Sequence, residues 1–260
     1  MHKVEIEKYD LSTKTSKKIA DYVAEEKPLH LFVNTTYWAT ILCSPSNLKE
    51  MTIGHLLSEG ILKSTAEIEK VTLKETEGSC HVNLKAEVNV DERLSLSRLH
   101  QRIVTSSCGE SIYQYQRKPA KVTSNLKVKA EVVFNSVNQL NFKAEVFRQT
   151  GGVHAAAIYK ADGSIVALAE DVGRHNAVDK VIGMVALKQT RFGECFLTST
   201  GRLSGDIVFK ASKVGLPIVA SLGAALDSGV AMAKAANLTL AGFVRGKRMN
   251  IYTFSERILP

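Results

Sequence analysis

The polar residues best suited to binding or catalysis gather in one stretch of the chain, residues 150–180. A glycine-bearing cluster opens this stretch, and a cluster rich in histidine, arginine and acids closes it. An apolar hairpin pattern lies between them and predicts that both clusters stand at the ends of paired strands. The candidate site residues of this stretch are Gly151, Gly152, His154, Arg174, His175 and Asn176.

Four polar loops share one character, since each couples glycine to arginine, histidine or a hydroxyl residue. They are 150–154, 171–176, 199–204 and 245–248. Glycine lets backbone N–H groups approach an anion, arginine clamps it with two hydrogen bonds, and helix N-termini favour negative charge. Together the loops predict a site for a phosphorylated or pyrophosphate-containing ligand, although the basic turn taken alone is more often solvated. The further candidates are Arg202, Arg245, Gly246, Lys247 and Arg248.

Two histidines in these loops leave two interpretations open. His154 and His175 can act as acid–base groups, or each can hydrogen-bond a neighbouring loop and set its shape. Acids nearby, Asp171 among them, are expected to pair with Arg174 and Lys180 in a structural role. No loop matches the phosphate-binding GxxxxGK[ST] motif or the GxGxxG dinucleotide motif, so ATPase and Rossmann assignments lack support.

A single cysteine in a polar, basic connector is the candidate nucleophile. Cys108 lies between serines and a glycine, with no apolar neighbours to bury it, and nearby arginines favour its thiolate. A thiol on a mobile loop suits a group carrier, whose sulfur must visit a donor and then an acceptor. An incidental cysteine in a linker is the alternative. The remaining cysteines, Cys43, Cys80 and Cys195, form no CxxC pair and indicate neither disulfides nor a zinc site.

The elements that must position these loops alternate between strands and helices in the second half of the chain. Helices are expected at 138–149, 176–188, 207–214 and 225–236, and strands at 158–160 and 165–167 as a hairpin, 196–198, 218–221, 238–244 and 249–253. This alternation predicts an α/β sheet with helices on its faces. The first ninety residues read as strands around one helix, which Asn47 is expected to cap. The predicted parts are a small α+β domain at 1–104, a mobile loop at 105–125 and an α/β domain at 126–260.

The totals limit the class of protein. The 260 residues are 45% hydrophobic and 23% charged, typical of a globular protein, and the net charge of +8 favours anionic partners without choosing among them. No apolar run is long enough to span a membrane, and the N-terminus lacks the apolar core of a signal peptide. We therefore expect a cytoplasmic protein that acts without a membrane.

At several positions the sequence closely resembles the formate dehydrogenase accessory sulfurtransferases, the FdhD family. The matching segments are 59–61, 150–156, 170–177 with 179–180, and 242–253. The resemblance implies a cytidine deaminase-like C-terminal domain, a smaller β-rich α+β N-terminal domain and a homodimer. It also adds Phe243 and Val244 to the basic turn as cofactor-binding candidates.

The resemblance implies a function as well. Family members take sulfur from a cysteine desulfurase as a cysteine persulfide. They pass it to the molybdenum of the bis-molybdopterin guanine dinucleotide cofactor, which formate dehydrogenase requires; guanosine nucleotides are expected to occupy the same site. Cys108 stands where the family has the first cysteine of a CxxC, and Ser111 replaces the second. A mechanism through a single persulfide needs only Cys108.

Two other functions compete with the sulfurtransferase. A zinc deaminase-like hydrolase predicts H-x-E followed by P-C-x-x-C, and residues 154–156 lack the glutamate while no cysteine pair exists. A cofactor chaperone that binds the pterin without enzymatic activity is the stronger alternative, because the second cysteine is missing. Neither nucleic acid nor a resident metal ion is expected.

Overall fold

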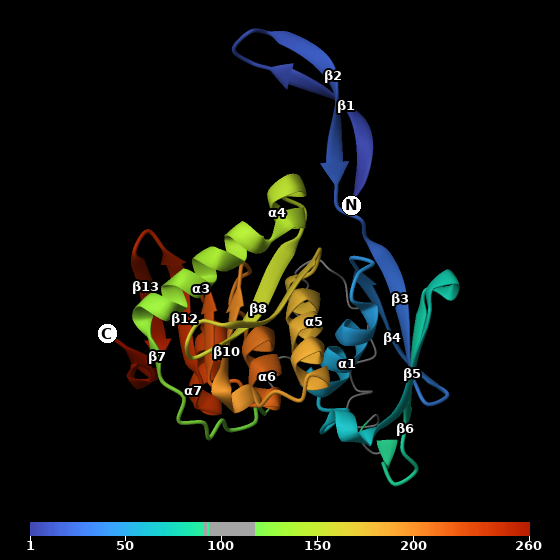
Figure 1. Cartoon of the computed structure of the whole chain (residues 1–260), viewed down its shortest axis with the longest axis vertical. Helices are drawn as coiled ribbons and strands as arrows, with labels where there is room; N and C mark the ends of the chain where they lie inside the picture. Colours follow the sequence, from blue (N-terminus) through green and yellow to red (C-terminus); the bar gives the residue numbers. More distant parts are fainter. Residues whose placement is uncertain (91–92, 94–117) are drawn as a thin grey trace.

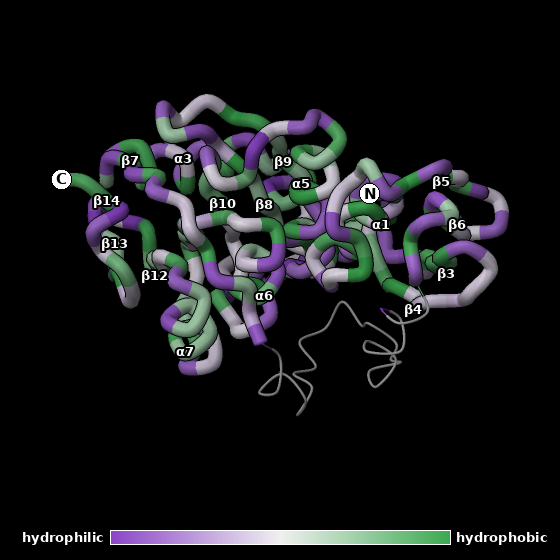
Figure 2. The backbone as a smooth tube through the Cα atoms, turned by 90° about the horizontal axis from the view of Figure 1, so that it is seen from below, coloured by the Kyte–Doolittle hydropathy of each residue, from purple (hydrophilic) through white to green (hydrophobic). Residues whose placement is uncertain are grey.

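The computed structural model describes residues 1–90, 93 and 118–260. Cys108 and most of the connector predicted at 105–125 lie outside these residues. The body is elongated, with a small sheet and α1 at one end, β12 and β13 at the other, and α5 between them (Figures 1 and 2).

The first half of the chain contains two β structures. An antiparallel ribbon projects from the body and consists of β1 (His2–Asp10) and β2 (Thr15–Val23) (Figure 1). The second structure is a sheet in the order β4-β3-β6-β5, built from β3 (Lys27–Val33), β4 (Thr36–Cys43), β5 (Ile68–Lys74) and β6 (Ser79–Leu84). The strands and the helix α1 (Leu48–Ser58) agree with the sequence pattern. The predicted capping of α1 by Asn47 is wrong. The Asn47 backbone is left-handed, with φ of 52°, and its side chain makes no capping hydrogen bond.

The second half of the chain forms a six-stranded sheet in the order β13-β12-β11-β10-β8-β9. Its strands are β8 (His154–Lys160), β9 (Ile165–Asp171), β10 (Cys195–Ser199), β11 (Ile218–Ser221), β12 (Thr239–Arg245) and β13 (Arg248–Thr253). The central pairs β10–β11 and β11–β12 are parallel, and the outer pairs are antiparallel. A two-stranded pair joins β7 (Val128–Lys129) to β14 (Ile258–Leu259) near the C-terminus.

Helices cover both faces of this sheet (Figure 1). They are α3 (Ala130–Lys143), α4 (Glu145–Thr150), α5 (Arg174–Leu187), α6 (Gly205–Val214) and α7 (Asp227–Ala236). Short 3₁₀ turns occupy Thr65–Glu67, Glu75–Glu77, Phe192–Glu194 and Ser255–Arg257. This arrangement confirms the predicted mixed α/β class.

The helix predicted at 138–149 is wrong in extent, because α3 begins at Ala130 and a break at Ala144 separates it from α4. Its inward face is formed by Val133, Val137 and Leu140, which pack against the sheet residues Tyr159 and Phe196. The spacing of these three residues is the helical signal that marks the true start.

The N-terminal helix α1 lies directly on α5. A Cβ atom at Gly54 would overlap the Asp179 carbonyl oxygen, and one at Gly183 would overlap that of Glu50, so only glycine lets the two backbones come this close. One hydrophobic cluster accordingly runs from Val33 and Leu56 of the first half to α5 and the large sheet. No helix of the described residues is long and apolar enough to cross a membrane.

Candidate functional site

The four predicted loops lie at one edge of the six-stranded sheet. His154 at the start of β8 pairs with Asp171 at the end of β9, and Ser199 at the end of β10 pairs with both Ala156 and Ser221. The turn between β12 and β13 follows the carboxyl end of β12, which is parallel to β11. The strand order therefore delivers the loops 150–154, 171–176, 199–204 and 245–248 to the same edge.

Three of these loops contact one another. His154 Nδ1 lies 3.3 Å from Thr200 Oγ1, and the same hydroxyl oxygen accepts a hydrogen bond of 3.0 Å from the Ala155 backbone N–H. The aliphatic part of Arg174 covers Gly201, where a Cβ atom would come within 3.0 Å of it. Residue 201 must therefore be glycine to leave room for the Arg174 side chain at the buried start of α5.

A fifth loop, residues 222–226, connects this cluster to the basic turn and was missed from the sequence. The Ser221 hydroxyl donates to the carbonyl oxygens of Ser199 (2.8 Å) and Gly201 (2.6 Å) and accepts from the Gly223 N–H (3.0 Å). The Phe243 N–H in turn donates to the Gly223 carbonyl oxygen at 3.0 Å. A repeated Ser-x-Gly at 199–201 and 221–223, each after a buried strand, is the signal that could have found this loop.

The basic turn is exposed and has an unusual backbone. Gly246 and Lys247 are both left-handed, with φ of 58° and 61°, as the tight turn between antiparallel strands requires. Phe243 is also left-handed, and the Arg245 guanidinium lies 5.4 Å from the centre of its ring. Val244 is buried, whereas the side chains of 245–248 face solvent. Of the predicted cofactor residues in this segment, Phe243 is half-buried, and the four residues of the turn, 245–248, are exposed.

Three other predicted site residues have a structural role in the loops. Gly151 ends α4 with φ of 64°, and Gly152 lies against Ala24. The Asn176 amide nitrogen donates to the Leu42 carbonyl oxygen and to Asp171 Oδ1. Their participation in ligand binding stays a prediction.

A buried ion pair holds the loop before α5. Lys180 Nζ lies 2.7 Å from Asp171 Oδ2, both side chains are fully buried, and Asp171 also accepts from the backbone N–H groups of Ser44 and Gly173. Of the acid–base pairings expected from the sequence, this one is confirmed. Asp179 pairs elsewhere, with Lys210 of α6.

We use the name polar seam for the ionisable and hydroxyl side chains gathered where α1, α5 and α6 meet. The Lys210 ammonium group donates to both Asp179 oxygens (3.0 and 2.9 Å), to Ser58 Oγ (3.0 Å) and to Glu59 Oε1 (3.1 Å). The polar seam consists of His55, Ser58, Glu59, His175, Asp179, Asp206 and Lys210. The seam begins at the loop edge, because His175 lies in the first turn of α5 and Asp206 in that of α6.

Comparison with known proteins decides the family. A model of the FdhD/NarQ family matches residues 24–259, nearly the whole chain. The chain belongs to the FdhD/NarQ family. The resemblance seen in the sequence is therefore confirmed.

Relatives of this FdhD/NarQ protein match along almost their whole length. A Saccharolobus solfataricus protein named sulfur carrier protein FdhD is 37% identical over an alignment of 262 positions, which covers 98% of this chain and 99% of the relative. A protein of the same name from Shouchella clausii is 35% identical over an alignment of 252 positions, which covers 93% of this chain and 91% of the relative. A crystal structure from Desulfotalea psychrophila, described as a formate dehydrogenase accessory protein, superposes with a TM-score of 0.80 over 99% of both chains. Its 24% identity supports the fold alone.

In the polar seam of this FdhD/NarQ protein, the pKa values of the two central charged groups are shifted from their usual values. Burial alone would raise the pKa of Asp179, but Lys210 and then His55 outweigh it and hold that pKa below its usual value. Burial would likewise lower the pKa of Lys210, but Asp179 and Glu59 raise it above its usual value. Both groups are therefore charged at neutral pH.

The two histidines at the loop edge are both less basic than usual. Burial, followed by the charges of Arg174 and Lys210, lowers the pKa of His175 to about 3. Burial also lowers the pKa of His154, with Arg174 and Arg202 as the next causes. Both imidazoles are neutral at pH 7, so each offers one donor and one acceptor nitrogen.

Two polar side-chain atoms at the starts of α5 and α6 are buried without a hydrogen-bond partner in the described part of the chain. His175 Nε2 and Ser204 Oγ are shielded from solvent, and neither has a hydrogen-bond partner among the described residues. The N-cap residues of both helices make no side-chain capping hydrogen bond, although the Gly205 N–H of α6 donates to Ser228 Oγ at 3.2 Å. Donor groups, neutral imidazoles and nearby arginine suit an anionic ligand with several acceptor oxygens.

The described cysteines are unsuited to sulfur transfer. Cys43, Cys80 and Cys195 are all buried, and burial raises the pKa of each thiol, that of Cys43 to about 12. All three are free cysteines, as the sequence predicts. No group of three or more potential metal ligands occurs in the described part of the chain.

Proposed function

We propose that this protein is a sulfur carrier that serves formate dehydrogenase, acting in the cytoplasm as a homodimeric sulfurtransferase. Its donor is a cysteine desulfurase, and its acceptor is the bis-molybdopterin guanine dinucleotide cofactor. The observation that carries the proposal is full-length similarity to proteins named sulfur carrier protein FdhD, at 37% and 35% identity. Cys108 supports it, because the three described cysteines are buried with raised thiol pKa values.

The chemistry of the carrier has two steps. The Cys108 thiolate attacks the terminal sulfur of the donor enzyme's persulfide; a new S–S bond forms at Cys108, and the donor cysteine leaves as a thiolate. In the second step the terminal sulfur, at formal oxidation state zero, passes to the acceptor as sulfide and takes up two electrons. A reduced molybdenum centre can supply both, and Cys108 leaves as a thiolate. No second cysteine is needed, consistent with Ser111.

The loop edge is the proposed acceptor site. A guanine dinucleotide carries a pyrophosphate, and the exposed side chains of Arg202, Arg245 and Arg248 can hold it electrostatically. His175 Nε2 and Ser204 Oγ would supply hydrogen bonds that they lack among the described residues. The N-termini of α5 and α6 favour the same negative charge.

The proposed fold of residues 126–260 is cytidine deaminase-like. What supports it is a sheet in which a β8–β9 hairpin leads into α5, and β10 into α6, with both helices starting at one edge. In zinc deaminases that chemistry needs a His/Cys metal set and a glutamate. Residues 154–156 read His-Ala-Ala and provide no glutamate, so the fold argues for a related scaffold with different chemistry.

Sulfur loading tests the carrier role. After incubation with a cysteine desulfurase and cysteine, mass spectrometry should find one added sulfur atom on the Cys108 peptide and none on the peptides of Cys43 or Cys195. Cys108→Ser should neither load nor activate formate dehydrogenase. If Cys108→Ser activates the dehydrogenase as well as the wild type, the protein is a cofactor chaperone and the carrier assignment is wrong.

Guanosine diphosphate binding tests the acceptor site. Charge-assisted hydrogen bonds contribute about 1.5–3 kcal/mol each, so Arg245→Ala or Arg248→Ala should raise the dissociation constant by roughly tenfold or more in calorimetry. Arg191→Ala, which removes an exposed arginine outside the loop edge, is the matched control. Equal affinities for all three variants would remove the basic turn from the site.

A further inference from the structure

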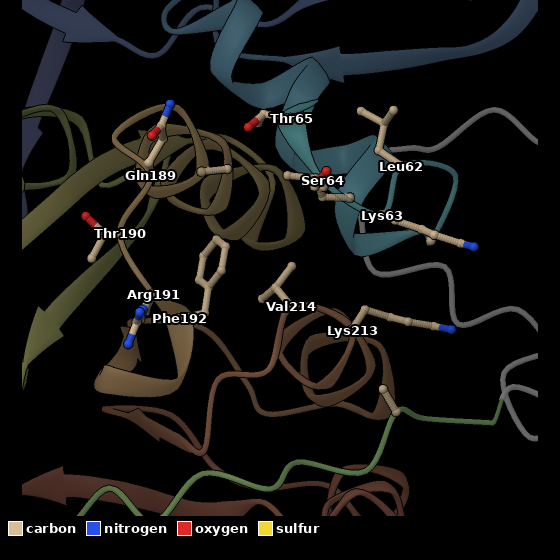
Figure 3. Close-up of a pocket in the computed structure, with 14 residues that line it drawn as sticks. Leu62, Lys63, Ser64, Thr65, Gln189, Thr190, Arg191, Phe192, Lys213 and Val214 are labelled. Carbon is tan, nitrogen blue, oxygen red and sulfur yellow. The ribbon is translucent and has the colours of Figure 1, made fainter. Parts of the chain in front are cut away.

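A second concave site lies away from the loop edge, at the carboxyl ends of α5 and α6. It has a volume of about 610 Å³, within the range of ligand pockets. The turn after α1 forms one wall, and residues 189–192 after α5 form another (Figure 3). Since α5 has 14 residues and rises about 1.5 Å per residue, the pocket and the loop edge lie roughly 20 Å apart.

The lining combines an apolar centre with a basic rim. Phe192 and Val214 lie in the middle, Arg191 lies on one side, and the Lys63 and Lys213 side chains extend together on the other (Figure 3). No acidic residue lines the pocket among the described residues. Arg191 is 3.5 Å from Glu194, but neither lysine forms an ion pair within 1–90, 93 and 118–260. Among the described residues, the rim therefore carries two lysines outside any ion pair, and Lys63 also interacts electrostatically with the nearby Glu67 carboxylate.

The backbone at the pocket selects against a simple anion. Carboxyl ends of helices carry partial negative charge, so α5 and α6 oppose a phosphate at the floor while the lysines attract negative charge at the rim. Ser64, Thr65 and Gln189 add groups that both donate and accept. A ligand that fits offers N–H donors, an apolar side chain and carboxylates. A peptide segment with acidic and apolar residues has all three.

The pocket also lies between the two ends of the connector that carries Cys108. On one side, Arg93 donates to the Ile61 carbonyl oxygen at 3.0 Å and makes two hydrogen bonds to Glu67. On the other side, Ala120 lines the pocket itself. Cys108 precedes Ala120 by twelve residues, so an extended chain of at most roughly 40 Å joins it to the pocket. A protein held here is within reach of the carrier thiol.

We propose that this pocket is the docking site for the sulfur donor, and that it binds an acidic, partly apolar surface segment of that protein. The inference rests on the proposed function, since it concerns the donor of the same sulfur. Phe192 and Val214 take the apolar side chain, and Lys63 and Lys213 pair with its carboxylates. Rim charges mainly set association rate and salt dependence, so the pocket recruits the donor by electrostatic attraction.

Direct binding to a purified cysteine desulfurase tests the docking site. Lys63→Glu/Lys213→Glu should raise the dissociation constant at least about tenfold in biolayer interferometry, chiefly through a slower association rate, and flatten its salt dependence. Lys63→Arg/Lys213→Arg keeps the charge and should bind like the wild type. Lys17→Glu/Lys234→Glu reverses two exposed lysines outside the pocket with the same change in net charge and should also bind like the wild type. Thermal melting confirms that each variant is folded.

The outcomes separate this inference from the proposed function. If Lys63→Glu/Lys213→Glu binds the desulfurase as tightly as the wild type while Cys108 loads normally, the docking site is wrong and the carrier role stands. If Cys108 never loads but desulfurase binding is lost in this variant alone, the docking site stands and the carrier role is wrong. If the variant instead loses only guanosine diphosphate binding, the pocket is a nucleotide site and the inference is overturned.

Discussion

Replacing Lys210 with methionine tests how the polar seam supports the site. The Lys210 ammonium nitrogen lies 2.9–3.1 Å from four oxygen atoms, two of them on Asp179. Its side chain is 6% exposed and that of Asp179 only 2%, so the substitution leaves a buried carboxylate without its main counter-charge. Methionine fills a similar volume and adds no cavity.

The expected loss of stability follows from that burial. Removing one partner of a buried ion pair costs about 3–5 kcal/mol, because the other charge stays desolvated. Asp179 keeps hydrogen bonds from Ser58 (2.7 Å) and His55 (3.1 Å), so Lys210→Met should cost about 3 kcal/mol, the lower end. Small proteins unfold in urea with slopes up to about 3 kcal/mol per molar, so the midpoint should fall by roughly 1 M.

Urea denaturation at pH 5 and pH 7 measures how much stability Lys210→Met loses and tests whether the buried Asp179 carboxylate causes the loss. Without Lys210, burial raises the pKa of Asp179 above its unfolded value of 3.8. A carboxyl group with a raised folded pKa gains stability as pH falls towards 3.8, so the loss should be smaller at pH 5 than at pH 7. Lys234→Met, at an exposed position on α7, should change stability by less than about 0.5 kcal/mol. A Lys210→Met midpoint equal to that of Lys234→Met would refute the reasoning.

Two further predictions concern α5. Gly183→Ala drives a Cβ atom into the Glu50 carbonyl oxygen and should cost about 1–3 kcal/mol in the same assay, whereas Gly193→Ala meets only ordinary contacts and should cost less than about 1; equal losses would show that α1 and α5 can separate freely. His175 has a folded pKa of about 3 against 6.5 unfolded, so the unfolded chain binds its proton first and stability falls as pH drops below 6.5. His175→Gln should remove up to about 1.4 kcal/mol per pH unit of that loss, and parallel stability curves for both proteins between pH 6 and 4 would contradict it.

Local patterns in the sequence were enough to predict most of the second half of the chain. Buried runs such as 218–221 are bounded by polar turns, and Gly215 ends α6 with φ of 83°, as a helix-stopping glycine should. The four loops could be selected by residue type alone, since glycine beside arginine or histidine is a local feature. Their meeting at one edge follows from the α/β alternation, which places successive strand ends together.

The polar seam could not be predicted, because its members come from three helices far apart in the sequence. His55 and Asp179 are separated by 124 residues, and Lys210 follows Asp179 by 31. In sequence, His55 belongs to an apolar stripe, and Lys210 resembles any solvated lysine on an amphipathic helix. The close approach of α1 to α5 at Gly54 brings His55 to Asp179. A single glycine within a helical pattern does not predict such a contact.

Two buried ion pairs, Lys180–Asp171 and Lys210–Asp179, hold the start of α5 in place. Lys180 binds Asp171 and the carbonyl oxygens of Ser44 and Glu170, while the adjacent Asp179 turns to Lys210. Consecutive helical residues point about 100° apart, so the helix cannot rotate without breaking one of the two buried pairs. The N–H groups and the neutral His175 at its first turn are therefore held in place before any ligand arrives. In the proposed acceptor site, binding an anion would therefore cost little ordering entropy, which would leave more of the interaction energy available for affinity.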